Sequence, residues 1–184
     1  MEWIVLALAA GVVVYAIIIY NGLVSKRQMV REGWSGIDVQ LKRRTDLIPN
    51  LMETVKGYMA HERETLDAVV NARARATSAA AAGPEARAQA EGELSAALGR
   101  LLAVAEAYPD LKANTTFLEF QNALQGVEEE IQMARRYYNG AVRNLNIQVE
   151  SFPSNLVANA FKFEQAEYFE LENEAERAVP QVKF

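Results

Sequence analysis

The first 25 residues differ in hydrophobic pattern from the rest of the chain. From Trp3 to Ser25 there is no charge, and residues 4–20 are almost wholly aliphatic. About 20 such residues cross a hydrocarbon core, and Trp3, Tyr15 and Tyr20 suit its two interfaces. The pattern predicts a transmembrane helix. A cleaved signal peptide is the alternative, but the chain has no basic segment before the apolar run and no small-residue cleavage site after it.

Beyond this span, apolar residues keep a helical spacing in several consecutive segments. The first segment continues the membrane helix for some turns. Asp46 as an N-cap and Pro49 in a first turn predict that a second helix starts there and runs to about Thr77. Pro84 is placed to open a third helix, and Pro109 to stop it.

The most regular pattern lies in the C-terminal half. Thr116-Phe-Leu-Glu119 has the form of a capping box. Apolar residues then recur at spacings of three and four, which is typical of coiled-coil packing and predicts a helix of about 35 residues. Phe152-Pro153 is expected to end it, with Ser154 capping a short final helix. The repeating positions are Phe117, Phe120, Leu124, Val127, Ile131, Ala134, Tyr138, Ala141 and Leu145.

No segment shows the two-residue period of a strand. The expected fold is therefore all-α, with a single N-terminal transmembrane helix followed by an antiparallel four-helix bundle of long helices. Three parts are expected: a transmembrane helix (1–25), a helical-bundle domain (26–163) and an acidic C-terminal tail (164–184).

Charges beside the span predict its orientation. Lys26, Arg27 and Arg31 follow the apolar run, and nothing positive precedes it. The positive-inside rule then places the N-terminus outside and the C-terminal domain in the cytoplasm, as a single-pass protein of a bacterial inner membrane. The formal net charge of −5 argues against nucleic acid as a partner.

The sequence offers little catalytic chemistry. His61-Glu62 invites a zinc interpretation, but a zincin needs a second histidine four residues later, and position 65 is Thr. A di-iron bundle fails on the same lack of histidine. Cysteine, nucleophile elbows and phosphate-binding loops are absent from the sequence. We expect no catalytic residue, metal or cofactor, and interpret His61 as a partly exposed bundle residue.

Small residues suggest where copies of the chain could meet. Ala7-x-x-x-Gly11 has the spacing that lets membrane helices approach closely. Gly33 and Gly36 flank Trp34, which indicates either local helix weakness or a close-packed or hinged point at the membrane exit. Ala7, Gly11, Gly33, Trp34 and Gly36 are the candidate self-association residues.

Lys42, Arg43 and Arg44 form a basic cluster with two interpretations. Cations complement the dipole at a helix C-terminus, and the same three side chains could form a partner-binding patch. A second apolar stripe contains Met52, Met59, Leu66 and Val70, and it either widens the core or offers an adaptable contact.

The chain resembles the LemA family of bacterial membrane proteins. The matching segments span most of the chain: YNGLV (20–24), IDVQLKRRTDLIPNL (37–51), VKGYMAHE (55–62), AEAYPDLKAN (105–114), RRYYNGAVRNLN (135–146) and FPSNLVA (152–158). The resemblance implies one N-terminal membrane helix, an outside N-terminus and a cytoplasmic helical bundle. It implies no established enzymatic activity. Some relatives occur beside membrane metalloproteases or in magnetosome membrane formation.

The expected function is that of a membrane-anchored, non-enzymatic scaffold acting through homo-oligomerisation and through partner binding at the cytoplasmic face. The expected partners are the lipid bilayer, further copies of the chain and a membrane or cytoplasmic protein. The alternative is an adaptor or regulator of a membrane protease or envelope-stress system.

Overall fold

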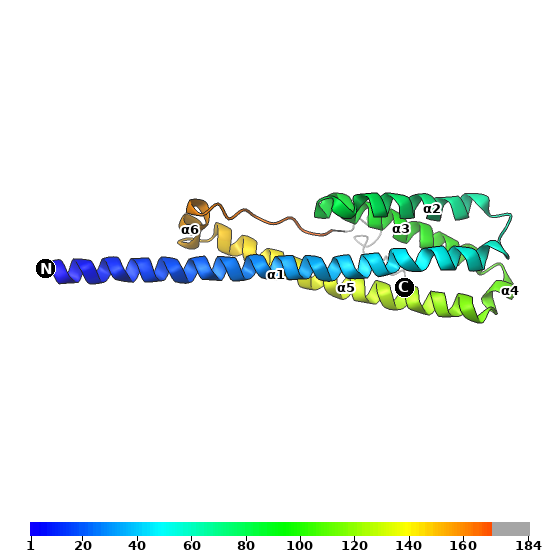
Figure 1. Cartoon of the computed structure of the whole chain (residues 1–184), viewed down its shortest axis with the longest axis horizontal. Coiled ribbons are helices and arrows are strands. Elements are labelled where there is room, and N and C mark those ends of the chain that lie inside the picture. Colours follow the sequence, from blue (N-terminus) through cyan, green and yellow to red (C-terminus); the bar gives the residue numbers. More distant parts are fainter. Residues whose placement is uncertain (171–184) are drawn as a thin grey trace, which may run out of the picture. The chain divides into compact units, whose positions relative to one another are not determined.

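The computed structural model describes residues 1–170, and these residues form helices, turns and one irregular segment, without a β-strand. The expected all-α class is confirmed for this part of the chain. The elements, labelled in Figure 1, are α1 (Glu2–Lys56), α2 (Arg63–Ser78), the short 3₁₀ helix η1 (Ala79–Ala81), α3 (Pro84–Ala105), α4 (Pro109–Lys112), α5 (Thr115–Glu150) and α6 (Ser154–Ala160).

The helix α1 is continuous over 55 residues, so the break predicted at Asp46 and Pro49 is wrong. Proline lacks the N–H that would bond to the carbonyl oxygen four residues earlier, here that of Thr45. The structure supplies another donor: Arg73 of α2 bonds to this oxygen through Nε at 3.1 Å. The helix therefore passes through Pro49 and ends at Lys56.

Two other helix boundaries, the start of α5 and the end of α3, also differ from their predicted positions. The helix α5 begins at Thr115, and the side-chain oxygen of Asn114 accepts a hydrogen bond from the Phe117 N–H at 3.0 Å. Asn114 is therefore the N-cap, and the box at Thr116 is wrong. Likewise α3 already ends at Ala105, so Pro109 opens α4 instead of stopping α3.

Ser154 does not cap α6. Its hydroxyl donates to the carbonyl oxygens of Gln148 at 2.6 Å and Ser151 at 2.9 Å. Gln148 lies in the last turn of α5, where carbonyl oxygens lack helical partners, so the hydroxyl satisfies one of these acceptors. The expected short final helix itself is confirmed as α6.

The chain divides into two compact units, and both α1 and α5 contribute to each. Among the described residues, the first unit comprises 1–37 and 133–168, and the second comprises 38–132 with 169–170. The division predicted from the sequence separates a membrane span (1–25) from a helical domain (26–163) and a tail (164–184). It rests on the membrane boundary and not on compactness, and it stays a prediction. Residues 171–184 of the expected tail lie outside the described residues.

The second unit contains a hydrophobic core to which α1, α2, α3, α4 and α5 all contribute. Met52, Met59 and Leu66 are buried in it, whereas Val70 is exposed, so the second apolar stripe belongs to the core at three of its four residues. The other buried members of the core are Ile48, Leu51, Val55, Val69, Ala72, Ala76, Leu94, Leu98, Leu101, Ala105, Leu111, Phe117 and Leu124.

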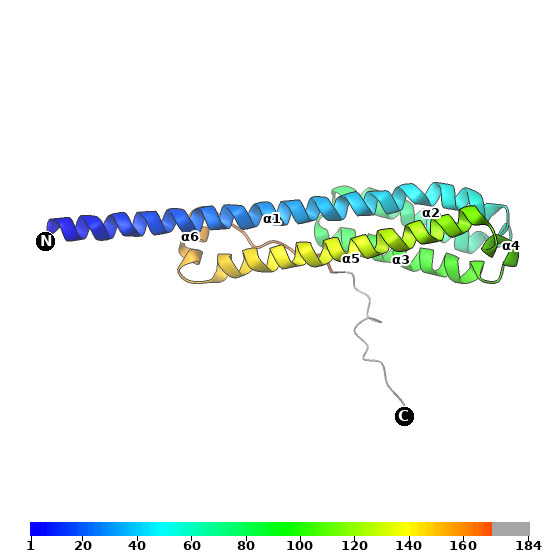
Figure 2. The ribbon, with the colours of Figure 1, turned by 90° about the horizontal axis from the view of Figure 1, so that it is seen from below.

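In the first unit α1 and α5 run side by side in opposite directions (Figure 2). Their contact is apolar and includes α6, with a core of Ile19, Leu23, Leu145, Val149, Ala158 and Phe163. The chain after α6 is neither helix nor strand and is fixed to α5 by Asn146. The Asn146 side chain donates to the Ala166 carbonyl at 3.0 Å and accepts from the Ala166 N–H at 2.9 Å.

The repeating apolar positions of α5 are buried or half-buried at all nine predicted residues. The heptad prediction therefore identified the packed face of this helix. The spacing of apolar residues identifies the buried face of a helix directly, because residues three and four apart lie on the same side of it.

Candidate functional site

The N-terminal part of α1 exposes its apolar side chains on every side. Trp3, Ile4, Leu8 and Val12 are all exposed. Among the described residues this is the one helical stretch long and apolar enough to cross a membrane, and none of it is buried against the rest of the chain. An apolar surface of this size favours contact with lipid over contact with water.

Three of the candidate self-association residues, Ala7, Gly11 and Gly36, are exposed. A Cβ added at Gly11 or Gly36 would meet no atom within 4 Å. Gly36 follows Gly11 by 25 residues, about seven turns at 3.6 residues per turn, so they lie on nearly the same side of α1. That side forms an exposed stripe, here called the small-residue stripe: Ala7, Gly11, Ile18, Ser25, Met29 and Gly36.

Gly33 and Trp34 are used within the chain instead. A Cβ at Gly33 would lie 3.0 Å from the Tyr138 Cα and 3.1 Å from the Tyr137 Cδ1. The Trp34 ring packs against the Tyr138 ring, with centroids 5.5 Å apart. Of the two earlier interpretations of this Gly-Trp-Gly region, close packing therefore applies to Gly33 and Trp34, and the partner is α5 of the same chain.

The basic cluster does not form one surface. Arg43 is exposed, and exposed Lys42 pairs with Asp46 at 2.5 Å, one turn along α1. Arg44 is only 3% exposed and points into the second unit. Because α1 continues to Lys56, these cations do not lie at a helix C-terminus either. The candidate patch is reduced to Lys42 and Arg43.

Arg44 is the centre of a buried ionic cluster. Its guanidinium pairs with Glu91 at 2.5 Å and with Glu128 at 3.0 Å, and donates to the Ser95 hydroxyl at 2.7 Å. Glu91 is 1% exposed, whereas Glu128 is partly open to solvent beside a cavity of about 370 Å³. Burying an ion pair is costly unless the two charges meet, and here they hold α1 against α3 and α5. The Arg44 Nε is buried without a hydrogen-bond partner.

A second arginine joins the same helices. Arg87 of α3 pairs with Asp38 of α1 at 2.7 Å and donates to the Ala80 carbonyl at 2.9 Å. Arg44 of α1 pairs with Glu91 of α3, and Arg87 of α3 pairs with Asp38 of α1, so both buried arginines hold α1 against α3. Their partners lie far away in sequence, and the sequence analysis did not identify them.

Tyr138 is a buried tyrosine of α5 in the first unit. Its hydroxyl donates to the Glu167 carbonyl at 2.8 Å. Burial, and then the charge of Glu167, raises the pKa of Tyr138 to about 12. The tyrosine therefore stays protonated and holds the segment after α6 against α5.

A pocket of about 380 Å³ on α5 is lined by three arginines. None of the three was predicted as a site residue. Arg135, Arg136 and Arg143 line it with Asn139, Gly140 and Tyr168. The sequence does contain a signal for them: Arg143 follows the Arg-Arg pair by seven and eight residues, about two helical turns, which places the three on one side of the helix.

His61, interpreted from the sequence as a partly exposed bundle residue, is exposed, but it lies in the turn after α1 and not on a helix. Within residues 1–170, no group of three or more His, Cys, Asp or Glu side chains is arranged to hold a metal ion.

Comparison with known proteins gives consistent matches. The model of the LemA family matches residues 33–184. The chain is 27% identical over 175 residues to magnetosome protein MamQ 2 of Paramagnetospirillum magneticum and 24% identical over 174 residues to MamQ of Magnetospirillum gryphiswaldense. Each alignment covers 82% of this chain and 64% of the relative. Protein LemA of Metamycoplasma hominis is 27% identical over 138 residues, which cover 75% of this chain and 63% of that protein. The chain thus spans less than two thirds of the length of these relatives.

Proposed function

Because the chain belongs to the LemA family, we propose that it is a membrane-anchored scaffold without enzymatic activity, which acts by forming homo-oligomers and binding a protein partner. The membrane association is supported by the exposed apolar part of α1 and by the magnetosome proteins among its relatives. The oligomer and the partner are the parts of the proposal that need direct tests.

The continuity of α1 is the observation that carries the proposal. One helix of 55 residues begins in the apolar stretch and ends in the core of the second unit. The same helix therefore supplies both the candidate membrane contact and part of this core. The interior Pro49 is compensated by Arg73, so the continuity is maintained where the sequence alone predicts a break.

In this proposal the N-terminus lies outside, and residues 26–184 form a cytoplasmic domain built on an antiparallel four-helix bundle. Lys26, Arg27 and Arg31 directly follow the apolar stretch and favour this orientation. A reporter fused after Phe184 is expected to be active only as a cytoplasmic fusion. Activity of a periplasmic reporter at the same site would contradict the orientation.

The small-residue stripe is the proposed contact between copies. Lipid tails are as apolar as the helix, so hydrophobicity does not drive helices together in a bilayer, whereas close packing at small residues does. Gly11 and Gly36 have free space beside them. Closed symmetry is the usual solution for identical subunits, so a ring contacted along this stripe is expected.

Cysteine crosslinking in native membranes tests the oligomer. The chain contains no cysteine, so single variants Ala7→Cys, Gly11→Cys and Gly36→Cys report only on the chosen position. Glu129→Cys, exposed on α5, is the surface control. Crosslinked dimers are expected at the three stripe positions and not at the control.

Two results would change the proposal. Absence of crosslinks at all three stripe positions, at ordinary expression, would reject the scaffold and favour a monomeric adaptor or regulator of a membrane protease. Equal crosslinking at Glu129→Cys would show random collision instead of a specific contact. For the adaptor, exposed Lys42 and Arg43 would be the first partner-binding residues to test.

A further inference from the structure

The segment around α6 exposes large apolar side chains. Phe152 is 80% exposed, Leu156 is 60% exposed and Phe161 is 61% exposed. The stretch from residue 151 to residue 161 contains no charged side chain. Soluble protein surfaces seldom gather apolar groups in this way unless something covers them.

The position of Phe161 shows where along α1 this segment lies. Its ring contacts the Tyr20 ring edge-on, with centroids 4.8 Å apart. Tyr20 lies in the last turns of the uncharged stretch of α1, where aromatic residues typically mark the membrane interface. The apolar surface of α6 therefore lies at the level where α1 leaves the bilayer.

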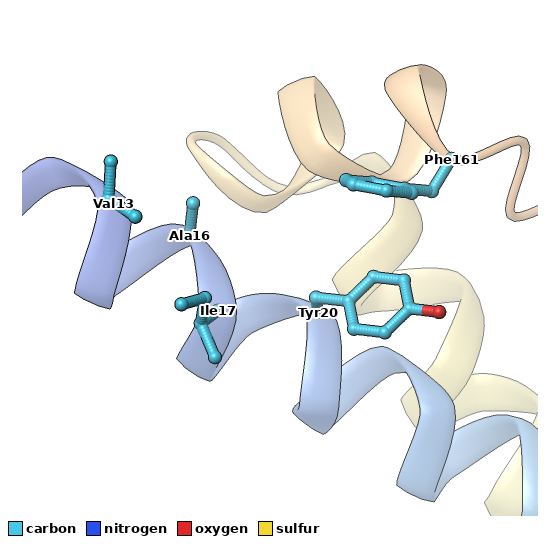
Figure 3. A pocket seen from close by; sticks show the side chains of 5 residues that line it. All are labelled: Val13, Ala16, Ile17, Tyr20 and Phe161. Carbon is cyan, nitrogen blue, oxygen red and sulfur yellow. The ribbon is translucent and has the colours of Figure 1, made fainter.

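An apolar groove of about 320 Å³ lies between α1 and α6 at this level. It is lined by Val13, Ala16, Ile17, Tyr20 and Phe161 (Figure 3). In that view the Phe161 ring lies over the Tyr20 ring, and Val13 and Ala16 point to the same side of α1. The groove begins at residues of the proposed span, so the proposed anchoring places acyl chains around it instead of water.

Cations lie just beyond the groove. Arg27 packs its guanidinium over the Phe163 ring, 4.8 Å from the centroid, and Lys162 is exposed immediately after Phe161. Lys26 lies six residues beyond Tyr20, about 9 Å along the helix at 1.5 Å per residue. Apolar groups followed at that distance by cations match the order of acyl chains and anionic headgroups in one leaflet.

We propose that the segment from Phe152 to Phe161 is a second membrane contact, embedded in the interface of the leaflet where α1 emerges, with a lipid acyl chain in the groove beside Tyr20. The inference rests on the proposed membrane anchoring of α1. It adds that the lipid, and not another copy of the chain, covers α6.

Spin labels on the full-length protein in phosphatidylglycerol-containing nanodiscs test this inference. Single cysteines at Phe152 and Leu156 carry the nitroxide, and accessibility to oxygen is compared with accessibility to a water-soluble nickel chelate. Val13→Cys is the reference inside the span, and Glu129→Cys is the reference in water. Both α6 labels are expected to shift towards the oxygen-accessible values of Val13→Cys.

The references separate the possible failures. A water-like Val13→Cys would reject the anchoring itself. A lipid-like Val13→Cys with water-like α6 labels would reject only the α6 contact. Labels at Phe152 and Leu156 that are shielded from both reagents would show that a protein surface covers α6, and would also reject the lipid assignment.

A lipid with a photoreactive acyl chain tests the groove. Irradiation of the full-length protein in the same nanodiscs is expected to attach the lipid to peptides that contain Phe161. The variant Phe161→Ser, whose α6 backbone contacts remain, is expected to lose most of the labelling on its α6 peptide while labelling of the α1 peptide persists. Unchanged labelling of the α6 peptide in this variant would overturn the groove assignment.

Discussion

Arg73 donates a hydrogen bond through Nε to the carbonyl oxygen of Thr45, at 3.1 Å, across the α1–α2 interface. That oxygen is the acceptor that Pro49 leaves without its helical partner. A side chain on the neighbouring helix thus replaces a missing backbone donor. The relationship explains how α1 continues through a proline.

The first prediction concerns this replacement. Arg73→Met should destabilise the chain by about 1–3 kcal/mol, because it leaves a partly buried carbonyl oxygen unsatisfied. Pro49→Ala restores a backbone N–H to the same oxygen. In the Pro49→Ala background, Arg73→Met should therefore lower the free energy of unfolding markedly less. The difference between the two backgrounds is the coupling energy of the two sites. Urea unfolding of the full chain in detergent, followed by circular dichroism, measures both costs.

Arg75→Met is the matched control, since Arg75 lies on the same helix and pairs with Glu93 at the surface. An exposed pair contributes about 0–1 kcal/mol, so this variant should be nearly neutral in both backgrounds. Equal costs of Arg73→Met with proline or alanine at position 49 would contradict the proposed replacement.

The second prediction concerns the buried pair of Arg44 and Glu91. Arg44→Met leaves the Glu91 carboxylate buried without its partner and should destabilise the chain by about 3–5 kcal/mol. The double variant Arg44→Met/Glu91→Leu removes both charges and should recover much of that loss. Lys42→Ala, which breaks an exposed pair two residues away, should cost under about 1 kcal/mol. Thermal unfolding measures all three variants. A small effect of Arg44→Met, similar to Lys42→Ala, would instead support an exposed basic patch.

The differences between sequence and structure share one physical cause. The helical class, the packed face of α5 and the candidate span depend on local periodicity or local composition, and these were predicted. The continuity of α1, by contrast, depends on Arg73, 28 residues from Thr45. The burial of Arg44 depends on Glu91, 47 residues away. No local pattern specifies such a partner, because tertiary contacts decide which exposed-looking polar residue is buried.

The candidate site shows the same limit. Small residues at Gly11, Gly33 and Gly36 are equivalent by sequence, since each permits close approach of a helix. The structure distinguishes them, because only Gly33 has Tyr137 and Tyr138 against it. Whether the remaining small residues contact a second copy is a property of the assembly, which a single chain does not contain.

The third prediction concerns Tyr138 and pH. An unfolded tyrosine has a pKa near 10, and burial followed by the charge of Glu167 raises the pKa of Tyr138 to about 12. The native state therefore retains the proton longer than the unfolded state. The stabilisation is fully present below about pH 10 and is lost as the pH rises towards about 12.

Tyr138→Phe isolates this effect. At neutral pH the variant should be less stable by about 1 kcal/mol, because the hydrogen bond to the Glu167 carbonyl is lost. Above pH 10 the stability advantage of the natural chain over the variant should shrink, since only the natural chain has this proton to lose. Urea unfolding of both chains between pH 8 and pH 11 gives the difference. A difference independent of pH would show that the native pKa of Tyr138 is not raised.

The last prediction separates the two glycines that flank Trp34. Gly33→Ala places a Cβ 3.0 Å from the Tyr138 Cα, a backbone atom that cannot move alone. Overpacking of this kind costs about 1–3 kcal/mol, so the first unit should lose stability. The Cβ of Gly36→Ala meets no atom within 4 Å, and the variant should gain up to about 1 kcal/mol of stability, because alanine favours a helix more than glycine does.

The larger Gly36→Leu should keep the monomer folded while blocking close approach along the small-residue stripe. Two measurements in detergent distinguish the glycines: Gly33→Ala is expected to lower the stability in unfolding curves, and Gly36→Leu is expected to lower the mass of the oligomer. If Gly36→Leu leaves the mass of an oligomer unchanged, the contact between copies lies elsewhere than the small-residue stripe.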